Sequence, residues 1–212
     1  SDGSRTLPDG TSLPASVIEA PASIGDEALD RAAALTPGDA SDIPQAALAA
    51  YQRAETVINR ADAGCNIPWQ LVAAIGRVES DHGRYGGNVL SSAGVAKPGI
   101  IGIALDGSND TARISDTDAG QLDGDRKFDR AVGPMQFIPS TWSVVGVDAD
   151  GDGQRDPQNI NDAALASAVY LCSGNEDLST TKGQRAAVYR YNNSDDYVDL
   201  VLSIMDAYSE GD

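Results

Sequence analysis

One carboxylic acid, Glu79, stands where an acid catalyst would be placed. It ends an apolar stretch, residues 67–78, in which Pro68 takes a first helical position and Val72 and Ile75 share the face of Glu79. A carboxyl group on that face, at the negative end of the helix dipole, should hold its proton more tightly than a surface glutamate. A raised pKa is what a general acid needs. The alternative for this position is a solvated charge or an ion-pair partner.

A second group of side chains, in the segment 148–162, has the spacing of an EF-hand calcium loop up to the glycine of that loop. Hard Ca²⁺ prefers carboxylate and carbonyl oxygens, and such oxygens recur here at alternate positions. The predicted ligands are three side chains and one backbone oxygen, those of Asp148, Asp150, Asp152 and Gln154. Carboxylates this close repel one another unless a cation neutralises them, which favours a structural calcium ion over a solvated acidic turn.

The closing position of this loop departs from the EF-hand pattern. Position twelve is Asn159, a poor bidentate ligand, where an EF-hand has a glutamate. Asp162, at the start of the next predicted helix, and Asp156, inside the loop, are both candidates to complete the metal site.

The elements that must position these groups are predicted to be mainly helical. Helical patterns cover residues 43–58, 67–78, 163–171 and 197–205. Residues 86–129 are rich in Gly and Asp and form a long loop-like insertion, which we expect to shape a cleft or act as a lid. Its aspartates lack EF-hand spacing. Residues 1–42 read as a linker, or as a segment wrapped around the domain 43–212.

The two cysteines flank the two segments that carry chemistry. Cys65 precedes the predicted helix of Glu79. Cys172 ends the helix that follows residues 148–162, which we call the acidic loop. A disulfide closing a loop of about 100 residues would stabilise the fold by up to about 4.7 kcal/mol in the chain-entropy model. These positions favour a disulfide, formed in an oxidising compartment, over two buried thiols.

Composition narrows the functional classes. The 212 residues form one domain plus tails, and a net charge of −17 argues against binding to nucleic acid, whose phosphates would be repelled. No stretch is long and apolar enough to span a membrane, and we expect an exported monomer. His82 is the only histidine; we expect a capping or surface residue rather than a catalytic one.

Three short motifs gain specificity from occurring together. They are Glu79-Ser80, Gly133-Pro134-Met135-Gln136-Phe137 followed by Pro139-Ser140, and Tyr191-Asn192. In this combination the chain resembles the lysozyme-like lytic transglycosylases of the SLT and membrane-bound lytic transglycosylase B-like group, bacterial enzymes that cut the glycan strands of peptidoglycan. The resemblance covers roughly residues 47–209.

The resemblance implies a mainly α, goose-type lysozyme or SLT catalytic domain with an EF-hand-like calcium loop closed by Asp162. It implies that Glu79 is the catalytic residue, that Ser80, Met135 and Gln136 line the substrate cleft, and that Tyr191 and Asn192 orient the sugar and its N-acetyl group. The alternatives are that Met135 and Tyr191 simply pack in the core, and that the two amides tie down nearby loops.

The family mechanism needs only one carboxylate. Glu79 would protonate the glycosidic oxygen between MurNAc and GlcNAc and then, as a carboxylate, deprotonate the C6 hydroxyl of the same muramic acid, which leaves a 1,6-anhydro end. The tethered nucleophile makes a second carboxylate dispensable. A hydrolytic muramidase that uses an aspartate of the insertion, and a non-catalytic calcium-stabilised wall-binding module, remain as alternatives. The expected location is the cell wall or envelope.

Overall fold

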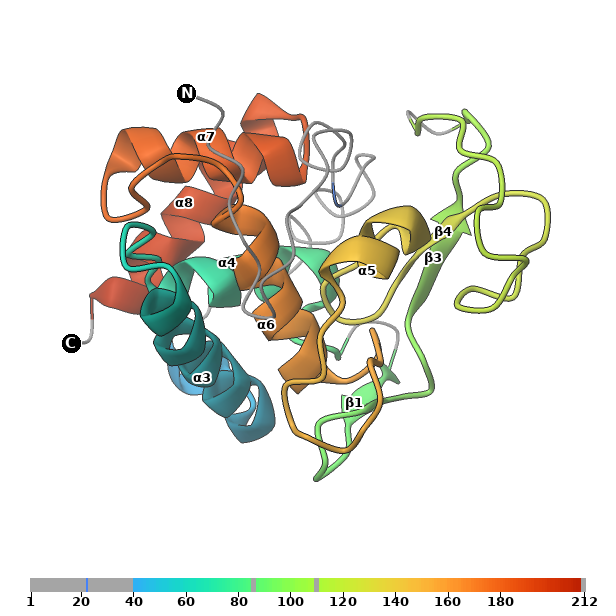
Figure 1. Cartoon of the computed structure of the whole chain (residues 1–212), viewed down its shortest axis with the longest axis horizontal. Helices are drawn as coiled ribbons and strands as arrows, with labels where there is room; N and C mark the ends of the chain where they lie inside the picture. Colours follow the sequence, from blue (N-terminus) through green and yellow to red (C-terminus); the bar gives the residue numbers. More distant parts are fainter. Residues whose placement is uncertain (1–21, 23–39, 85–86, 109–110, 211–212) are drawn as a thin grey trace.

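Helices are the predominant regular structure of the computed structural model, which describes residues 22, 40–84, 87–108 and 111–210 (Figure 1). In chain order the helices are a 3-10 turn Ala40–Asp42, α3 (Gln45–Ala61), α4 (Trp69–Ser80), α5 (Pro139–Val145), α6 (Ile160–Leu171), α7 (Thr181–Tyr191) and α8 (Asp195–Ser209). The prediction of a mainly α fold is confirmed. The predicted segment 1–42 lies outside the described residues, except for Ala22 and the 3-10 turn.

Two helices that are buried on nearly all sides form the centre of the domain. Every residue of α6 except Asn161 is buried, and α4 exposes little beyond parts of Trp69 and Arg77. A helix that is apolar all round must be covered on all sides. Accordingly α6 packs chiefly against α3, and α4 chiefly against α8. The predicted helix over 67–78 begins two residues later, because Pro68 has an extended backbone and is the N-cap rather than the first helical residue.

The structure also contains four short strands, β1 (Val89–Leu90), β2 (Ala96–Lys97), β3 (Ile101–Ala104) and β4 (Arg130–Val132). Of these, β3 and β4 lie beside α5, while β1 lies lower in the view (Figure 1). The strands pair as two antiparallel ribbons, β1 with β2 and β3 with β4. Three of the four belong to the predicted insertion 86–129, which therefore holds regular structure where the sequence indicated only a loop.

The predicted disulfide is confirmed. Cys65 and Cys172 are bonded, with their α-carbons 5.6 Å apart. The bond joins the segment before α4 to the residue that follows α6. The backbone N–H of Leu178 also donates to the carbonyl of Cys65, at 2.7 Å. The two central helices are thus tied together at the ends remote from the acidic loop.

No helix among the described residues is long and apolar enough to cross a membrane. Ala22 is completely buried, and its carbonyl accepts a hydrogen bond from the N–H of Ile138 at 2.9 Å. Among the described residues before residue 43, Ala22 and the 3-10 turn Ala40–Asp42 contact the domain, the turn through α8 and Ala40 through the core.

Candidate active site and acidic loop

Glu79 lies in the last turn of α4 and is completely buried. The hydroxyl of Tyr197, from the first turn of α8, donates to its Oε1 atom at 3.0 Å. Burial, reinforced by the nearby Glu79 carboxylate, raises the pKa of both Tyr191 and Tyr197 well above its usual value. Both phenols therefore stay protonated at any physiological pH and can act as hydrogen-bond donors.

Sequence reasoning missed Tyr197 as a site residue. The sequence indicated only that Tyr197 belongs to the helical pattern 197–205. In the structure the N-cap of this helix, Ser194, accepts the backbone N–H of Tyr197. Its contact with Glu79 joins residues 118 positions apart. No local pattern signals such a contact, because helical periodicity reports which face is buried and not what it meets.

The three motifs meet at the end of α4. Ser80 donates from its hydroxyl to the carbonyl of Pro134 at 2.6 Å and accepts the N–H of Gly83 at 2.8 Å. The Tyr191 hydroxyl donates to the carbonyl of Met135 at 2.9 Å. The residues next to Glu79, the Gly133–Phe137 loop and the end of α7 are therefore held in one cluster by buried hydrogen bonds.

All five predicted substrate residues belong to this cluster, and none is more than 4% exposed. The predicted residues are Ser80, Met135, Gln136, Tyr191 and Asn192. Their contact with sugar stays a prediction. Tyr191 and Met135 also pack in the core, as their alternative readings required: the Tyr191 ring lies 5.9 Å from Phe137 and 5.5 Å from Tyr170.

The two amides in the cluster differ in their hydrogen bonding. Gln136 has a left-handed backbone, with φ of 53°, and its Nε2 donates to the carbonyl of Gly133 at 2.9 Å. Asn192, the C-cap of α7, is 4% exposed, and its Nδ2 has no hydrogen-bond partner within the described part of the chain. A buried amide nitrogen without an acceptor is costly, and a bound group could supply the acceptor.

The expectation that His82 is a capping or surface residue is confirmed for the cap, because its backbone N–H donates to the carbonyl of Gly76 at 3.0 Å. His82 does follow the end of α4, but the surface placement is wrong, because the side chain is only 1% exposed. Its ring lies between two buried tyrosines instead of in solvent, with Nδ1 next to Tyr51 and Nε2 next to Tyr208.

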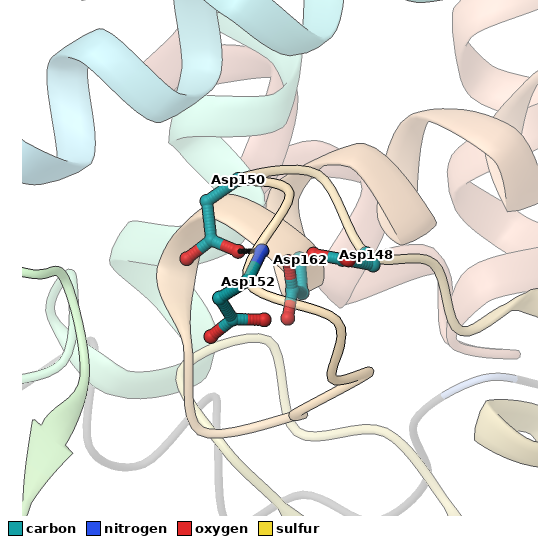
Figure 2. Close-up of side chains that lie close together, drawn as sticks. All are labelled: Asp148, Asp150, Asp152 and Asp162. Atoms are coloured by element: carbon teal, nitrogen blue, oxygen red, sulfur yellow. Dashed lines mark hydrogen bonds between the residues drawn. The ribbon is translucent and has the colours of Figure 1, made fainter.

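The acidic loop brings four carboxylates together, including one from α6 (Figure 2). Side-chain oxygens of Asp148, Asp150, Asp152 and Asp162 all lie within 4.8 Å of one another. Asp162 is buried and accepts the N–H groups of Ala149 at 2.7 Å and Asp156 at 3.0 Å. Burial nevertheless raises its pKa to about 6, and the charges of Asp150 and Asp148 add to that rise.

The other candidates around the loop have different roles. Among the described residues Asp156 is not part of the four-carboxylate group, and its Oδ1 accepts the N–H of Gln158 at 2.9 Å. Asn159 is the N-cap of α6 and donates from Nδ2 to Asp150 at 2.7 Å. That the backbone oxygen of Gln154 is a metal ligand stays a prediction.

The acidic loop also supports the Gly133–Phe137 motif. The side chain of Gln158 binds both backbone groups of Ile100, at 2.8 and 2.9 Å, and the N–H of Gly133 donates to the carbonyl of Ile100 at 2.8 Å. Gly133 has a φ of 79°, and a β-carbon there would overlap the carbonyl of Pro157. Movement of Pro157 and Gln158, the loop exit where the chain leaves the acidic loop, would therefore displace the Gly133–Phe137 motif.

A second acidic group lies in the insertion. Carboxylate oxygens of Asp116, Asp118 and Asp123 are within 4.8 Å of one another, although their sequence spacing is not that of an EF-hand. Most of these oxygens accept backbone N–H groups of their own turns, such as Asp118 from Leu122 at 2.8 Å and Asp123 from Arg130 at 2.8 Å. These aspartates organise the insertion.

Comparison with known proteins gives one family match. Residues 128–182 match a sequence model of the transglycosylase SLT domain. The structure aligns with the Escherichia coli lytic transglycosylase Slt35 in complex with bulgecin A at 15% sequence identity and a TM-score of 0.47, over 87% of this chain and 83% of that one. No curated protein sequence matches significantly. The family match spans the Gly133–Phe137 motif and the whole acidic loop, whereas Glu79 and Tyr191-Asn192 lie outside it. It agrees with the resemblance seen in the motifs: residues 128–182 of this chain are similar to the transglycosylase SLT domain.

Proposed function

We propose that the chain is a peptidoglycan lytic transglycosylase that cleaves the MurNAc-GlcNAc β-1,4 bond and leaves 1,6-anhydro-MurNAc ends. The observation that carries the proposal is the completely buried Glu79, hydrogen-bonded to Tyr197 where the three motifs meet. Burial disfavours the charged form of a carboxyl group, and a carboxylic acid that keeps its proton is a general acid. The SLT match over residues 128–182 supports the substrate class.

In the proposed reaction Glu79 gives its proton to the glycosidic oxygen while the bond from that oxygen to C1 of MurNAc breaks. The C6 hydroxyl of the same sugar then bonds to C1, and its proton passes to the Glu79 carboxylate. Glu79 is thereby regenerated and no water is consumed. The Tyr197 hydroxyl stabilises the carboxylate formed between the two steps, because a donor to the charged form favours it.

The remaining residues of the cluster bind and orient the sugar in this proposal. The Nδ2 of Asn192, buried and without a partner in the described structure, is suited to donate to the acetamido oxygen of MurNAc. Gln136 would bind the sugar together with Asn192. Its Nε2 donates to the carbonyl of Gly133, and its side-chain carbonyl oxygen would accept a hydrogen bond from the sugar.

The proposal uses one carboxylate, and the insertion supports that choice. The buried Asp129, which might have served a hydrolase, has its two oxygens engaged by the N–H of Thr117 at 3.0 Å and the hydroxyl of Thr117 at 2.7 Å. Asp123 is likewise buried and bound to backbone amides. These acids are occupied in holding their own turns.

We also propose that the acidic loop binds a structural Ca²⁺. Asp148, Asp150, Asp152 and Asp162 offer hard oxygen ligands at one place, as the cation requires. The bound cation would neutralise the repulsion among these carboxylates and stiffen the loop exit that supports Gly133. The disulfide between Cys65 and Cys172 fits an exported enzyme of the cell envelope, where thiols are oxidised.

The deciding experiment is mass spectrometry of purified peptidoglycan digested with the wild type and with Glu79→Gln. Wild type should release glycan ends lighter by one water, and Glu79→Gln should release none. Glu210→Gln, at an exposed position just after α8, is the matched control and should digest like the wild type. Reducing ends from the wild type would show a hydrolytic muramidase instead, and an absence of products would favour a wall-binding module.

The variant must also be folded for this result to count. Glu79→Gln should melt within a few degrees of the wild type, because Gln has nearly the same shape and can still accept from Tyr197. A collapsed fold would mean that Glu79 is a structural residue.

A further inference from the structure

A buried hydrogen-bonded bridge of three side chains lies just beyond Glu79. The Tyr51 hydroxyl, from α3, is 2.8 Å from Nδ1 of His82, and Nε2 of His82 is 2.9 Å from the hydroxyl of Tyr208, from α8. All three side chains are at most 3% exposed. One imidazole thus joins three helices at the point where α4 ends.

The bridge is electrically neutral. Burial, aided by the nearby charges of Arg84 and Arg77, lowers the pKa of His82 to about 3. Burial raises the pKa of Tyr208 to about 12 and that of Tyr51 well above its usual value. A neutral imidazole has one donor and one acceptor nitrogen, so each tyrosine meets a complementary group. The bridge therefore persists unchanged over the pH range in which an enzyme works.

The backbone at the bridge is held in an unfavourable conformation. Asp81 and His82 have φ of 51° and 57°, a left-handed region that side chains other than glycine rarely adopt. The N–H of His82 donates to the carbonyl of Gly76 at 3.0 Å and closes the helix. The Asp81 carboxylate is paired with Arg77 and Arg84. The side chains at this turn, rather than glycine, keep the end of α4 in place.

Helix α8 contacts α4 through two tyrosines on one face. Tyr197 reaches Glu79 and Tyr208 reaches His82. The tyrosines are eleven residues apart, which is about three helical turns at 3.6 residues each, so they point the same way. If α4 shifted along α8 at the His82–Tyr208 contact, the Glu79–Tyr197 contact could not keep its geometry.

We propose that His82 is a positioning residue: the Tyr51–His82–Tyr208 bridge fixes the end of α4 against α8 and thereby sets Glu79 against the hydroxyl of Tyr197. The role of this bridge in catalysis rests on the proposed function, whereas its effect on Glu79 can be measured without any substrate.

Gly76 supports the inference from the other side of the bridge. A β-carbon on Gly76 would overlap the Tyr51 hydroxyl. Only a glycine at this helical position lets Tyr51 pass over α4 to reach His82. The helix thus carries its least favourable residue but proline at the one place where the bridge crosses it.

The test is the titration of Glu79 by carbon-13 NMR in protein labelled at its six glutamates, with Glu79→Gln used to assign the signal. Tyr197→Phe should shift the titration midpoint of Glu79 by losing the direct donor. Tyr208→Phe should shift it in the same direction by at least about 0.5 pH, although the Tyr208 hydroxyl is bonded to His82. Tyr189→Phe, at a tyrosine that is 46% exposed, should leave it unchanged.

The double variant decides whether the bridge acts through Tyr197. If it does, Tyr197→Phe/Tyr208→Phe should give the same midpoint as Tyr197→Phe alone, because the contact to be positioned is already gone. Two shifts that add, or no shift in Tyr208→Phe, would overturn the inference. His82→Gln, which keeps a donor and an acceptor, should lie closer to the wild type than His82→Leu.

Activity gives an independent readout. On peptidoglycan, Tyr208→Phe and Gly76→Ala should lower kcat by roughly tenfold and leave KM within about twofold, the size expected when a hydrogen bond to a charged group is misplaced. A loss of kcat that only follows the folded fraction would contradict positioning. If the wild type releases no product at all, the proposed function fails, while the NMR titration still decides the role of His82.

Discussion

The end of α4 and the acidic loop at the start of α6 solve the same problem, holding polar groups in place, in opposite ways. At the end of α4 the buried groups Glu79, His82, Tyr197 and Tyr208 come from distant parts of the chain and satisfy one another. In the acidic loop the carboxylates of Asp148 and Asp152 accept N–H groups from the residues just after them. The first arrangement depends on packing; the second depends on charge.

The difference predicts different sensitivities. Hydrogen bonds between neutral buried groups do not respond to salt or moderate pH, but they fail when packing is disturbed. A group of four carboxylates responds to any cation or proton that changes its charge, and its fold is local. We therefore expect mutations and oxidation state to act on the helical region, and ions and pH to act on the acidic loop.

The largest effect should come from breaking the covalent tie of the helical region. Replacing Cys65 and Cys172 by Ser removes a bond between residues 107 apart and should lower the free energy of unfolding by about 4 kcal/mol, close to the chain-entropy limit for such a loop. Urea unfolding of the wild type and the double variant measures it. Equal midpoints would show that packing alone holds α4 to α6.

A smaller loss is expected from Gly133→Ala, at the junction of the two regions. The new β-carbon would overlap the carbonyl of Pro157, and φ of 79° strains any L residue. We expect the free energy of unfolding to fall by about 2 to 3 kcal/mol. Calcium binding should weaken by a comparable free energy, because the loop exit must move. Gly151→Ala is the control: its φ is 75°, but nothing lies within 4 Å of the new atom. It should cost only the backbone strain.

Removal of calcium should act on the acidic loop and spare the bridge. At a free concentration one hundred times its Kd, the ion would stabilise the fold by about 2.7 kcal/mol. Excess chelator should therefore lower the melting temperature, and Asp150→Asn should reduce the effect. The near-ultraviolet signal of the buried tyrosines near α4 should be unchanged by chelator below the melt. A melting curve indifferent to both chelator and calcium would contradict the metal site.

The smallest predicted effect is a pH dependence that reverses sign with calcium. The pKa of Asp162 is raised to about 6 in the folded state, above the ordinary value, so without a cation its contribution is fully present below about pH 4 and is lost as the pH rises through 6. With calcium, stability should instead grow over this window, because the cation needs the carboxylate. The melting temperature, measured from pH 4 to 7 with chelator and with calcium, should depend less on pH in Asp162→Asn under both conditions.

Some features of the site were predictable from the sequence because they are local. Helical spacing put Glu79 at the end of α4, and the alternation of aspartates indicated the acidic loop, since ligand spacing along a loop is a property of consecutive residues. The pairing of Cys65 with Cys172 was also predicted, with only two cysteines to choose from. The choice of Asp162 over Asp156 came from the family resemblance, and the structure places Asp162 in the group.

By itself, then, the sequence determined the mainly helical class, the position of the candidate acid, the acidic loop and the disulfide. Only the tertiary structure decided what surrounds the acid: Tyr197, 118 residues away, as its hydrogen-bond donor, and His82 as a buried bridge instead of a surface residue. The physical reason is that amphipathic patterns specify which side chains leave water, whereas the packing of one helix against another specifies which polar atoms then meet.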